Sequence, residues 1–300
     1  MNKAVRTRAV VALACTAALA GGLTACGGGE KAKPKSAAEM ISVAYQKTAA
    51  AKSAKVRMTM TMPASMKDGG TMEMSGVQGW DPAVMDLTVK GSALGSTPGA
   101  PESMRMIMQD QVMYMDLGAK AASEMEGKRW MKLDLQAAAK EAGPEGQAAL
   151  KQMNGLDGGM NQDPAQQLAL LLDSPSLKHV GPEKVDGVEA EHYKGSLTFE
   201  EMLKANESAK LLKEADREKL VESMKKAGVQ GYDTEVWVNE AGYPVRMKVA
   251  VKTAEGAMNM DAHYSDYGAA AKVQLPAEKD TLDLFKMLKD MGAGAKGGTA

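Results

Sequence analysis

The sequence predicts an α+β fold in which one antiparallel β-sheet is accompanied by amphipathic helices. Apolar and polar residues alternate with a period of two in a long series of short segments, which is typical of an antiparallel meander with one apolar face. Capping-box sequences at 36–39 and 198–201 mark the starts of two helices. The strands before and after the central helices share one pattern, so we expect a single sheet in a single domain over 36–290.

Residues 1–25 have the composition of a secretory signal peptide. Residues 1–8 hold three basic and no acidic side chains, residues 9–20 are apolar, and small residues follow. The apolar run is shorter than the roughly 20 residues that span a bilayer. We therefore expect this segment to be removed on export.

The stretch Leu23-Thr24-Ala25-Cys26 resembles the lipobox of bacterial lipoproteins. The resemblance implies that Cys26 becomes the first residue of the mature protein and carries acyl chains. The only other cysteine, Cys15, would leave with the signal peptide, so Cys26 would have no disulfide partner and no metal cluster. The alternative is a plain secreted protein in which Cys26 is incidental. We expect a protein anchored at the extracytoplasmic face of the cell membrane.

A tether and a helix follow the cysteine. Residues 26–35 are rich in glycine and lysine and predict a flexible spacer. Ser36 and Glu39 then form a capping box, and apolar residues at helical spacing predict an amphipathic helix over 37–52.

The strand pattern begins directly after this helix. Val56, Met58, Met60 and Met62 alternate with polar residues, which places them on one face of a strand. The same alternation predicts further strands around 72–75, 84–89, 104–108, 112–117 and 130–135.

The middle of the chain is helical, and strands return after it. Asp163 and Pro164 predict a helix start. The Asp186-Gly187 pair predicts a tight hairpin turn within 177–198. A helical stretch is expected over 199–227. The last strands are expected around 235–238, 245–251 and 258–262, followed by a short helix near 280–290 and a disordered tail over 291–300.

The order of these elements resembles the LppX/LprA/LprF/LprG lipoproteins of actinobacteria. The resemblance covers most of 36–277 and is most specific at 235–247, 264–268 and 273–276. It implies a LolA-like fold, a curved antiparallel half-barrel with helices packed on its concave face. It also implies a protein that holds or carries lipids or glycolipids of the cell envelope in an apolar cavity. The chain departs from the mycobacterial members in its methionine content.

Several other classes of function have little support in the sequence. The three histidines, His179, His192 and His263, lack a second histidine at i+4, and no GxSxG motif occurs. Without its signal peptide the chain would carry a net charge of −4, and no basic patch favours nucleic acid. We therefore expect no enzymatic activity, no cofactor, no His-centred metal site and no nucleic-acid partner, and we expect a monomer.

The 25 methionines allow three interpretations. They can be ordinary core residues, or the soft wall of a lipid cavity, or thioether ligands for Cu(I), for which Met58-x-Met60-x-Met62 is a suitable array. We prefer the lipid cavity, because the methionine pairs are scattered over several strands that also carry Val and Leu. The alternatives are a copper-handling lipoprotein and an envelope adaptor that transports nothing. The predicted cavity residues are Met58, Met60, Met62, Met72, Met74, Met85, Leu87, Met106, Met247, Val249, Met258 and Met260.

Overall fold

The computed structural model describes residues 36–66, 69–92, 102–144, 146–147, 163–205, 221–222, 225 and 228–287. These residues all belong to one compact unit, which begins at Lys35. The predicted signal peptide, Cys26, the tether and the tail over 291–300 lie outside the described residues.

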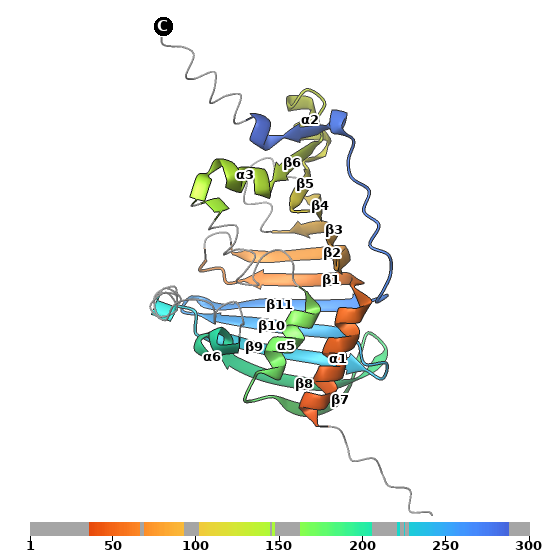
Figure 1. Cartoon of the computed structure of the whole chain (residues 1–300), viewed down its shortest axis with the longest axis vertical. Coiled ribbons are helices and arrows are strands. Elements are labelled where there is room, and N and C mark those ends of the chain that lie inside the picture. The colour runs from red at the N-terminus through yellow and green to blue at the C-terminus, as the bar shows by residue number, and fades with distance from the viewer. Residues whose placement is uncertain are drawn as a thin grey trace, which may run out of the picture. The chain divides into compact units, whose positions relative to one another are not determined.

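The described strands form one open sheet in the order β12-β6-β5-β4-β3-β2-β1-β11-β10-β9-β8-β7 (Figure 1). Neighbouring strands are antiparallel, except that β12 pairs in parallel with β6. The end strands β12 and β7 are not paired with each other, so the sheet is not a closed barrel. The predicted α+β half-barrel is confirmed. The strands are β1 (Ser53–Met62), β2 (Gly70–Trp80), β3 (Ala83–Gly91), β4 (Ser103–Gln109), β5 (Val112–Asp116), β6 (Trp130–Asp134), β7 (Lys178–Val185), β8 (Val188–Thr198), β9 (Gly231–Asn239), β10 (Pro244–Thr253), β11 (Gly256–Ser265) and β12 (Thr281–Asp283).

The first strand of the chain lies in the middle of the sheet. β1 pairs with β2 on one side and with β11 on the other. This pairing joins the N-terminal meander β1–β6 to the C-terminal strands β7–β11 (Figure 1). Residues from both ends of the chain therefore share one continuous face.

Two helices pack together on that face. In α1 (Ala37–Ala51) the predicted capping box is formed: Glu39 N donates to Ser36 Oγ at 3.2 Å, and Ser36 N donates to Glu39 Oε2 at 2.6 Å. In α5 (Pro164–Leu172) the Asp163 side chain accepts from Ala165 N at 2.8 Å. The buried side of α1 and the buried side of α5 belong to the same core cluster as residues of β1, β3 and β8–β11. The other described helices are α2 (Gly118–Glu124), α3 (Leu135–Glu141) and α6 (Phe199–Ala205).

The last two predicted helices agree in part with the structure. Near 280–290 the chain first forms a 3₁₀ turn, Glu278–Asp280, then the strand β12, and helical residues follow at 284–287. Leu282 pairs with Met131 of β6, so the first part of the predicted helix is instead an edge strand. Of the stretch predicted over 199–227, α6 accounts for the first seven residues, and most of the rest lies outside the described residues.

Candidate functional site

The strand register places all twelve predicted cavity residues on one face of the sheet. Met58 is paired with Met74 on β2 and with Ala262 on β11, and Met247 is paired with Ala262 from the other side. Leu87 is paired with Met106. Residues that face each other across strands point to the same side of a sheet, so the period-two pattern of each strand adds to one common apolar face.

This face is covered to different depths. Met58, Met85, Leu87, Met247 and Met260 are buried in the same cluster as Ile41 of α1 and Leu168 of α5. The remaining predicted residues are partly exposed: Met60, Met62, Met72, Met74, Met106, Val249 and Met258. The helix that packs beside α1 is α5.

Met60 lies at the centre of a group of methionines on three adjacent strands. Its register partners are Met72 on β2 and Met260 on β11. The neighbours along and across these strands are also methionines, and we call this group the methionine patch. It consists of Met58, Met60, Met62, Met72, Met74, Met258 and Met260. In the sequence these residues form three separate pairs or runs, so their contiguity appears only with the register of β11, β1 and β2.

A second methionine group occupies the same face on β3–β6. Met85 is paired with Met108, which is paired with Met113, and Met106 is paired with Met115, which is paired with Met131. Only Met85 and Met106 of this group were among the predicted cavity residues. Met108, Met113 and Met115 could have been predicted as well, because the alternation within 104–108 and 112–117 is the same pattern that identified the first group.

The opposite face of the sheet carries polar residues and, around His192 and Trp237, an aromatic and ionic network. The ring of His192 stacks on Trp237, with centroids 4.2 Å apart, and its Nδ1 lies 2.9 Å from Glu183 Oε1. Trp237 Nε1 donates to Glu183 Oε2 at 2.8 Å. The hydrogen bond from Trp237, followed by that from His192, lowers the pKa of Glu183. Together these contacts hold His192 as a packing residue.

All three histidines contact carboxylates. His179 lies beside Glu191, and His263 lies 2.7 Å from Asp186. No group of three or more His, Cys, Asp or Glu residues suited to a metal ion occurs among the described residues. In the structure each histidine lies beside a carboxylate on a neighbouring segment. That the chain has no His-centred metal site stays a prediction.

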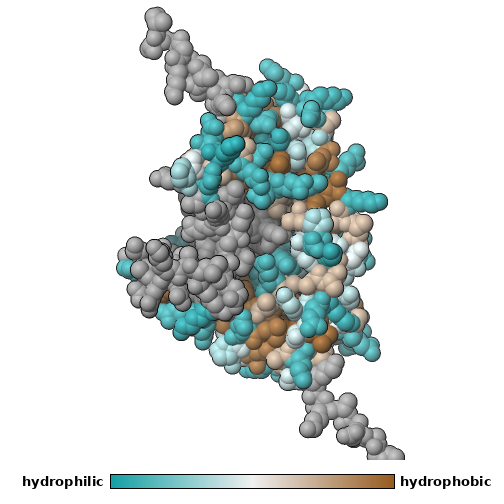
Figure 2. Space-filling view, viewed as in Figure 1, coloured by the Kyte–Doolittle hydropathy of each residue, from teal (hydrophilic) through white to brown (hydrophobic). Residues whose placement is uncertain are grey.

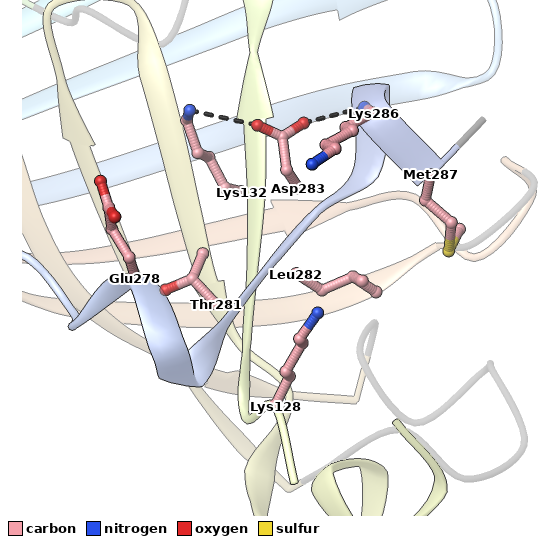
Figure 3. A pocket seen from close by; sticks show the side chains of 8 residues that line it. All are labelled: Lys128, Lys132, Glu278, Thr281, Leu282, Asp283, Lys286 and Met287. Carbon is pink, nitrogen blue, oxygen red and sulfur yellow. Dashed lines mark hydrogen bonds and ion pairs between the residues drawn. The ribbon is translucent and has the colours of Figure 1, made fainter. Parts of the chain in front are cut away.

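A polar pocket of about 780 Å³ surrounds the edge strand β12. Lys132 Nζ lies 3.2 Å from Asp283 Oδ2, and Asp283 Oδ1 accepts from Lys286 N at 3.0 Å (Figure 3). Burial opposes ionisation of Asp283, but the Lys286 amide and the Lys132 ammonium outweigh it and lower the pKa of this carboxyl. The pair therefore fastens β12 to β6. The pocket is lined by Lys128, Lys132, Glu278, Thr281, Leu282, Asp283, Lys286 and Met287.

The surface seen in Figure 2 is mostly hydrophilic, with hydrophobic residues exposed in small areas. Within the described residues, the large hydrophobic side chains that are well exposed are Tyr45, Val180, Val188 and Leu275. None of these four belongs to the twelve predicted cavity residues. In the described part of the chain, none of the helices has the length and hydropathy needed to cross a bilayer.

No known protein-family profile matches the chain. It is similar to an uncharacterized 31.2 kDa protein encoded in the rplA–rplJ intergenic region of Streptomyces griseus, with 29% identity over 272 residues that cover 88% of this chain and 83% of the relative. A Streptomyces coelicolor protein named "Putative lipoprotein" is 23% identical over 251 residues, which cover 82% of this chain and 74% of that protein.

Among solved structures, the lipoprotein LppX of Mycobacterium tuberculosis has a TM-score of 0.46 and 11% sequence identity, covering 79% of this chain and 98% of that chain. LprF from Mycobacterium bovis has a TM-score of 0.43 and 15% identity, covering 80% of this chain and 97% of that chain. LppX and LprF, the lipoproteins that the sequence resembles, are thus also among the solved structures to which this chain is similar.

Proposed function

We propose that this chain is a membrane-anchored lipoprotein that binds an acyl lipid or glycolipid of the cell envelope against the methionine-rich face of its sheet. The observation that carries the proposal is the common face itself. Twelve residues chosen from the sequence alone share one side of the sheet, and α1 and α5 pack on that side. An acyl chain between the sheet and the two helices would make apolar contacts of the same kind as those that the methionines make with the helices.

The energetics favour a ligand without polar anchoring. Each buried CH₂ contributes about 0.8 kcal/mol, so a long acyl chain gains on the order of 10 kcal/mol before the costs of ordering are subtracted. Methionine side chains are unbranched and adapt to irregular shapes. A face built largely from them suits a flexible chain of variable structure, and seven of the predicted residues remain partly exposed on it.

The anchor is part of the same proposal. The lipobox-like stretch before Cys26 and the name of the Streptomyces coelicolor relative both support acylation and an extracytoplasmic position. One acyl chain alone gives only marginal membrane binding. Several chains on Cys26, followed by the short tether over 26–35, would keep the apolar face within reach of the bilayer.

We infer binding rather than catalysis. His192 and His263 are engaged with carboxylates on the polar face of the sheet, and His179 pairs with Glu191 at the edge strand β7. The apolar face is built mostly from Met, Val and Leu, which supply no group for proton transfer, and burial raises the pKa of its Tyr264 hydroxyl further above the ordinary value. Enzymes instead shift the pKa values of their titratable groups toward the working pH.

The test is native mass spectrometry of the full chain purified from cells in detergent, before and after delipidation. We expect a lipid adduct that delipidation removes and that added lipid restores. Met74→Asp places a charge on the apolar face and is expected to abolish the adduct. Bare protein in every sample would contradict the proposal and would favour an adaptor that uses the same fold as a docking surface.

Ser75→Asp is the matched control, because Ser75 is the next residue on β2 and is exposed on the opposite face. This variant should retain the adduct. Circular dichroism of both variants separates loss of binding from loss of fold. If Met74→Asp is unfolded, Met74→Gln tests the same position with a neutral side chain of similar size.

A further inference from the structure

We propose that Met60, Met72 and Met260 form a binding site for the soft cation Cu(I), in the centre of the methionine patch. This inference concerns a different ligand from the lipid and does not depend on lipid binding. It comes from the register of three strands rather than from the run Met58-x-Met60-x-Met62 on one strand.

The three residues form one row across the sheet. Met60 is directly paired with Met72 on one side and with Met260 on the other. Directly opposed residues on antiparallel strands have Cβ atoms about 4.5–5.5 Å apart. A methionine side chain has three rotatable bonds before its methyl group. The two outer thioethers can therefore lean toward the one in the middle, so that three sulfur atoms meet at one ion above Met60.

The chemistry of the row selects for Cu(I). Thioethers are soft, neutral ligands that favour Cu(I), whereas Mg²⁺, Ca²⁺ and Mn²⁺ prefer carboxylates, carbonyls and water. The row continues with Val249 beyond Met260 and with Gly91 beyond Met72, so neither residue directly next to the three methionines supplies an oxygen or nitrogen side chain. The polar residues Thr59 and Asp261, which alternate with these methionines, point to the opposite face.

Two glycines flank one side of the patch. Gly91 is the register partner of Met72, and Gly70 is the register partner of Met62. Neither residue has a side chain to cover its methionine. Met60 and Met72 are correspondingly partly exposed, whereas Met260 is buried and fixes the inner end of the row. An ion approaching from the side of Met60 and Met72 would meet Met260 at the buried end of the row.

The test is an anaerobic titration of the delipidated full chain, in detergent, with Cu(I) in competition with a chromogenic Cu(I) chelator. We expect one Cu(I) per chain, an X-ray absorption spectrum with sulfur as the only near scatterer, and no comparable uptake of Zn²⁺. Met60→Leu conserves volume and apolarity but removes the central thioether, and we expect it to weaken Cu(I) binding at least tenfold.

Met247→Leu is the matched control. Met247 lies on the same face, but its register partners are Ala262 and Val236. Its replacement should change the Cu(I) affinity less than twofold. Equal affinity of Met60→Leu and wild type, equal loss in both variants, or oxygen or nitrogen in the ligand shell would overturn the inference. The lipid adduct of the wild-type chain is measured separately: its absence would contradict the lipid proposal and would leave the copper result unaffected.

Discussion

The carboxylate of Asp186 lies 2.7 Å from Nδ1 of His263, although 77 residues separate them in sequence. Asp186 belongs to the turn between β7 and β8, whereas His263 is on β11, with β9 and β10 between them in the sheet. Arg57 on β1 reaches the same carboxylate at 2.9 Å. The turn therefore folds back over the polar face, above a small apolar cluster around Trp237, and ties the edge hairpin to the centre of the sheet.

This tie predicts a pH-dependent contribution to stability. The hydrogen bond with His263 is the main cause that lowers the pKa of Asp186, and the charges of His263 and Arg57 add to it. A carboxyl with a lowered folded pKa stabilises the fold above its unfolded pKa, about 3.9, and this stabilisation is lost as the pH falls through the folded value. Asp186→Asn should therefore lower the free energy of unfolding at pH 7 by less than about 1 kcal/mol, because the pair is exposed, and should make no difference near pH 2.

Urea unfolding at both pH values measures this difference. Asn keeps the left-handed backbone that this position adopts, with φ 49°. Asp110→Asn is the control, because Asp110 also has a positive φ and, among the described residues, its side chain accepts a hydrogen bond from Gln109 rather than from a distant strand. An effect of Asp186→Asn that persisted unchanged at pH 2 would show that the tie is not ionic.

The Arg246–Asp261 pair should contribute more than the Arg57–Asp186 pair. Arg246 donates to both carboxylate oxygens, at 2.8 and 2.5 Å, and its guanidinium lies 5.0 Å from the Trp237 ring centroid. The side chains of this pair are 26% and 30% exposed, against 66% and 57% for Arg57 and Asp186. Burial opposes ionisation of Asp261, but the Arg246 hydrogen bonds and charge prevail and lower its pKa.

Arg246→Met should therefore cost about 1–3 kcal/mol, because it leaves a half-buried carboxylate without its bidentate partner. Arg57→Met should cost less than about 1 kcal/mol. Urea unfolding followed by tryptophan fluorescence compares the two variants. Similar losses in both would mean that burial does not distinguish these pairs.

The local elements of the fold were predictable from the sequence, and the pairings between distant segments were not. The capping box at Ser36 and the turn at Asp186-Gly187 involve neighbours in the chain, so their residue types identify them. By contrast, β12 depends on the contact of Leu282 with Met131, and no property of residues 278–290 shows which strand they will meet.

The candidate site shows the same limit. The alternation of methionines within β1 and β11 showed which face each strand buries. It did not show that β1 pairs with β11, which brings Met60 and Met260 together across about two hundred residues. The methionine pairs do lie on several strands, as the sequence indicated, but the register brings those of β1, β2 and β11 together into one patch.

Gly91 is expected to be essential for the edge of the methionine patch. A Cβ atom at Gly91 would lie 2.1 Å from the carbonyl oxygen of Thr71, and its φ is +134°. Gly91→Ala should therefore destabilise the fold by about 1–3 kcal/mol through overpacking, measured by thermal unfolding. Gly181→Ala is the control, because Gly181 has a similar φ of +141° with no heavy atom within 4 Å. Equal costs would show that backbone strain, rather than the contact with Thr71, determines the effect.

Cys26→Ser should release the protein from the membrane without changing its fold or its ligand. The lipobox-like stretch predicts acyl chains on Cys26, and stable anchoring needs more than one chain. We expect the wild-type chain in the membrane fraction with a mass increase from acylation, and Cys26→Ser in the soluble fraction or uncleaved. Because the tether over 26–35 separates Cys26 from α1, the released variant should retain the lipid adduct and the urea midpoint of wild type.

Cys15→Ser is the control, since Cys15 lies within the predicted signal peptide. Membrane association of Cys26→Ser with a correctly cleaved N-terminus would refute the anchor and would require another membrane contact in the folded domain.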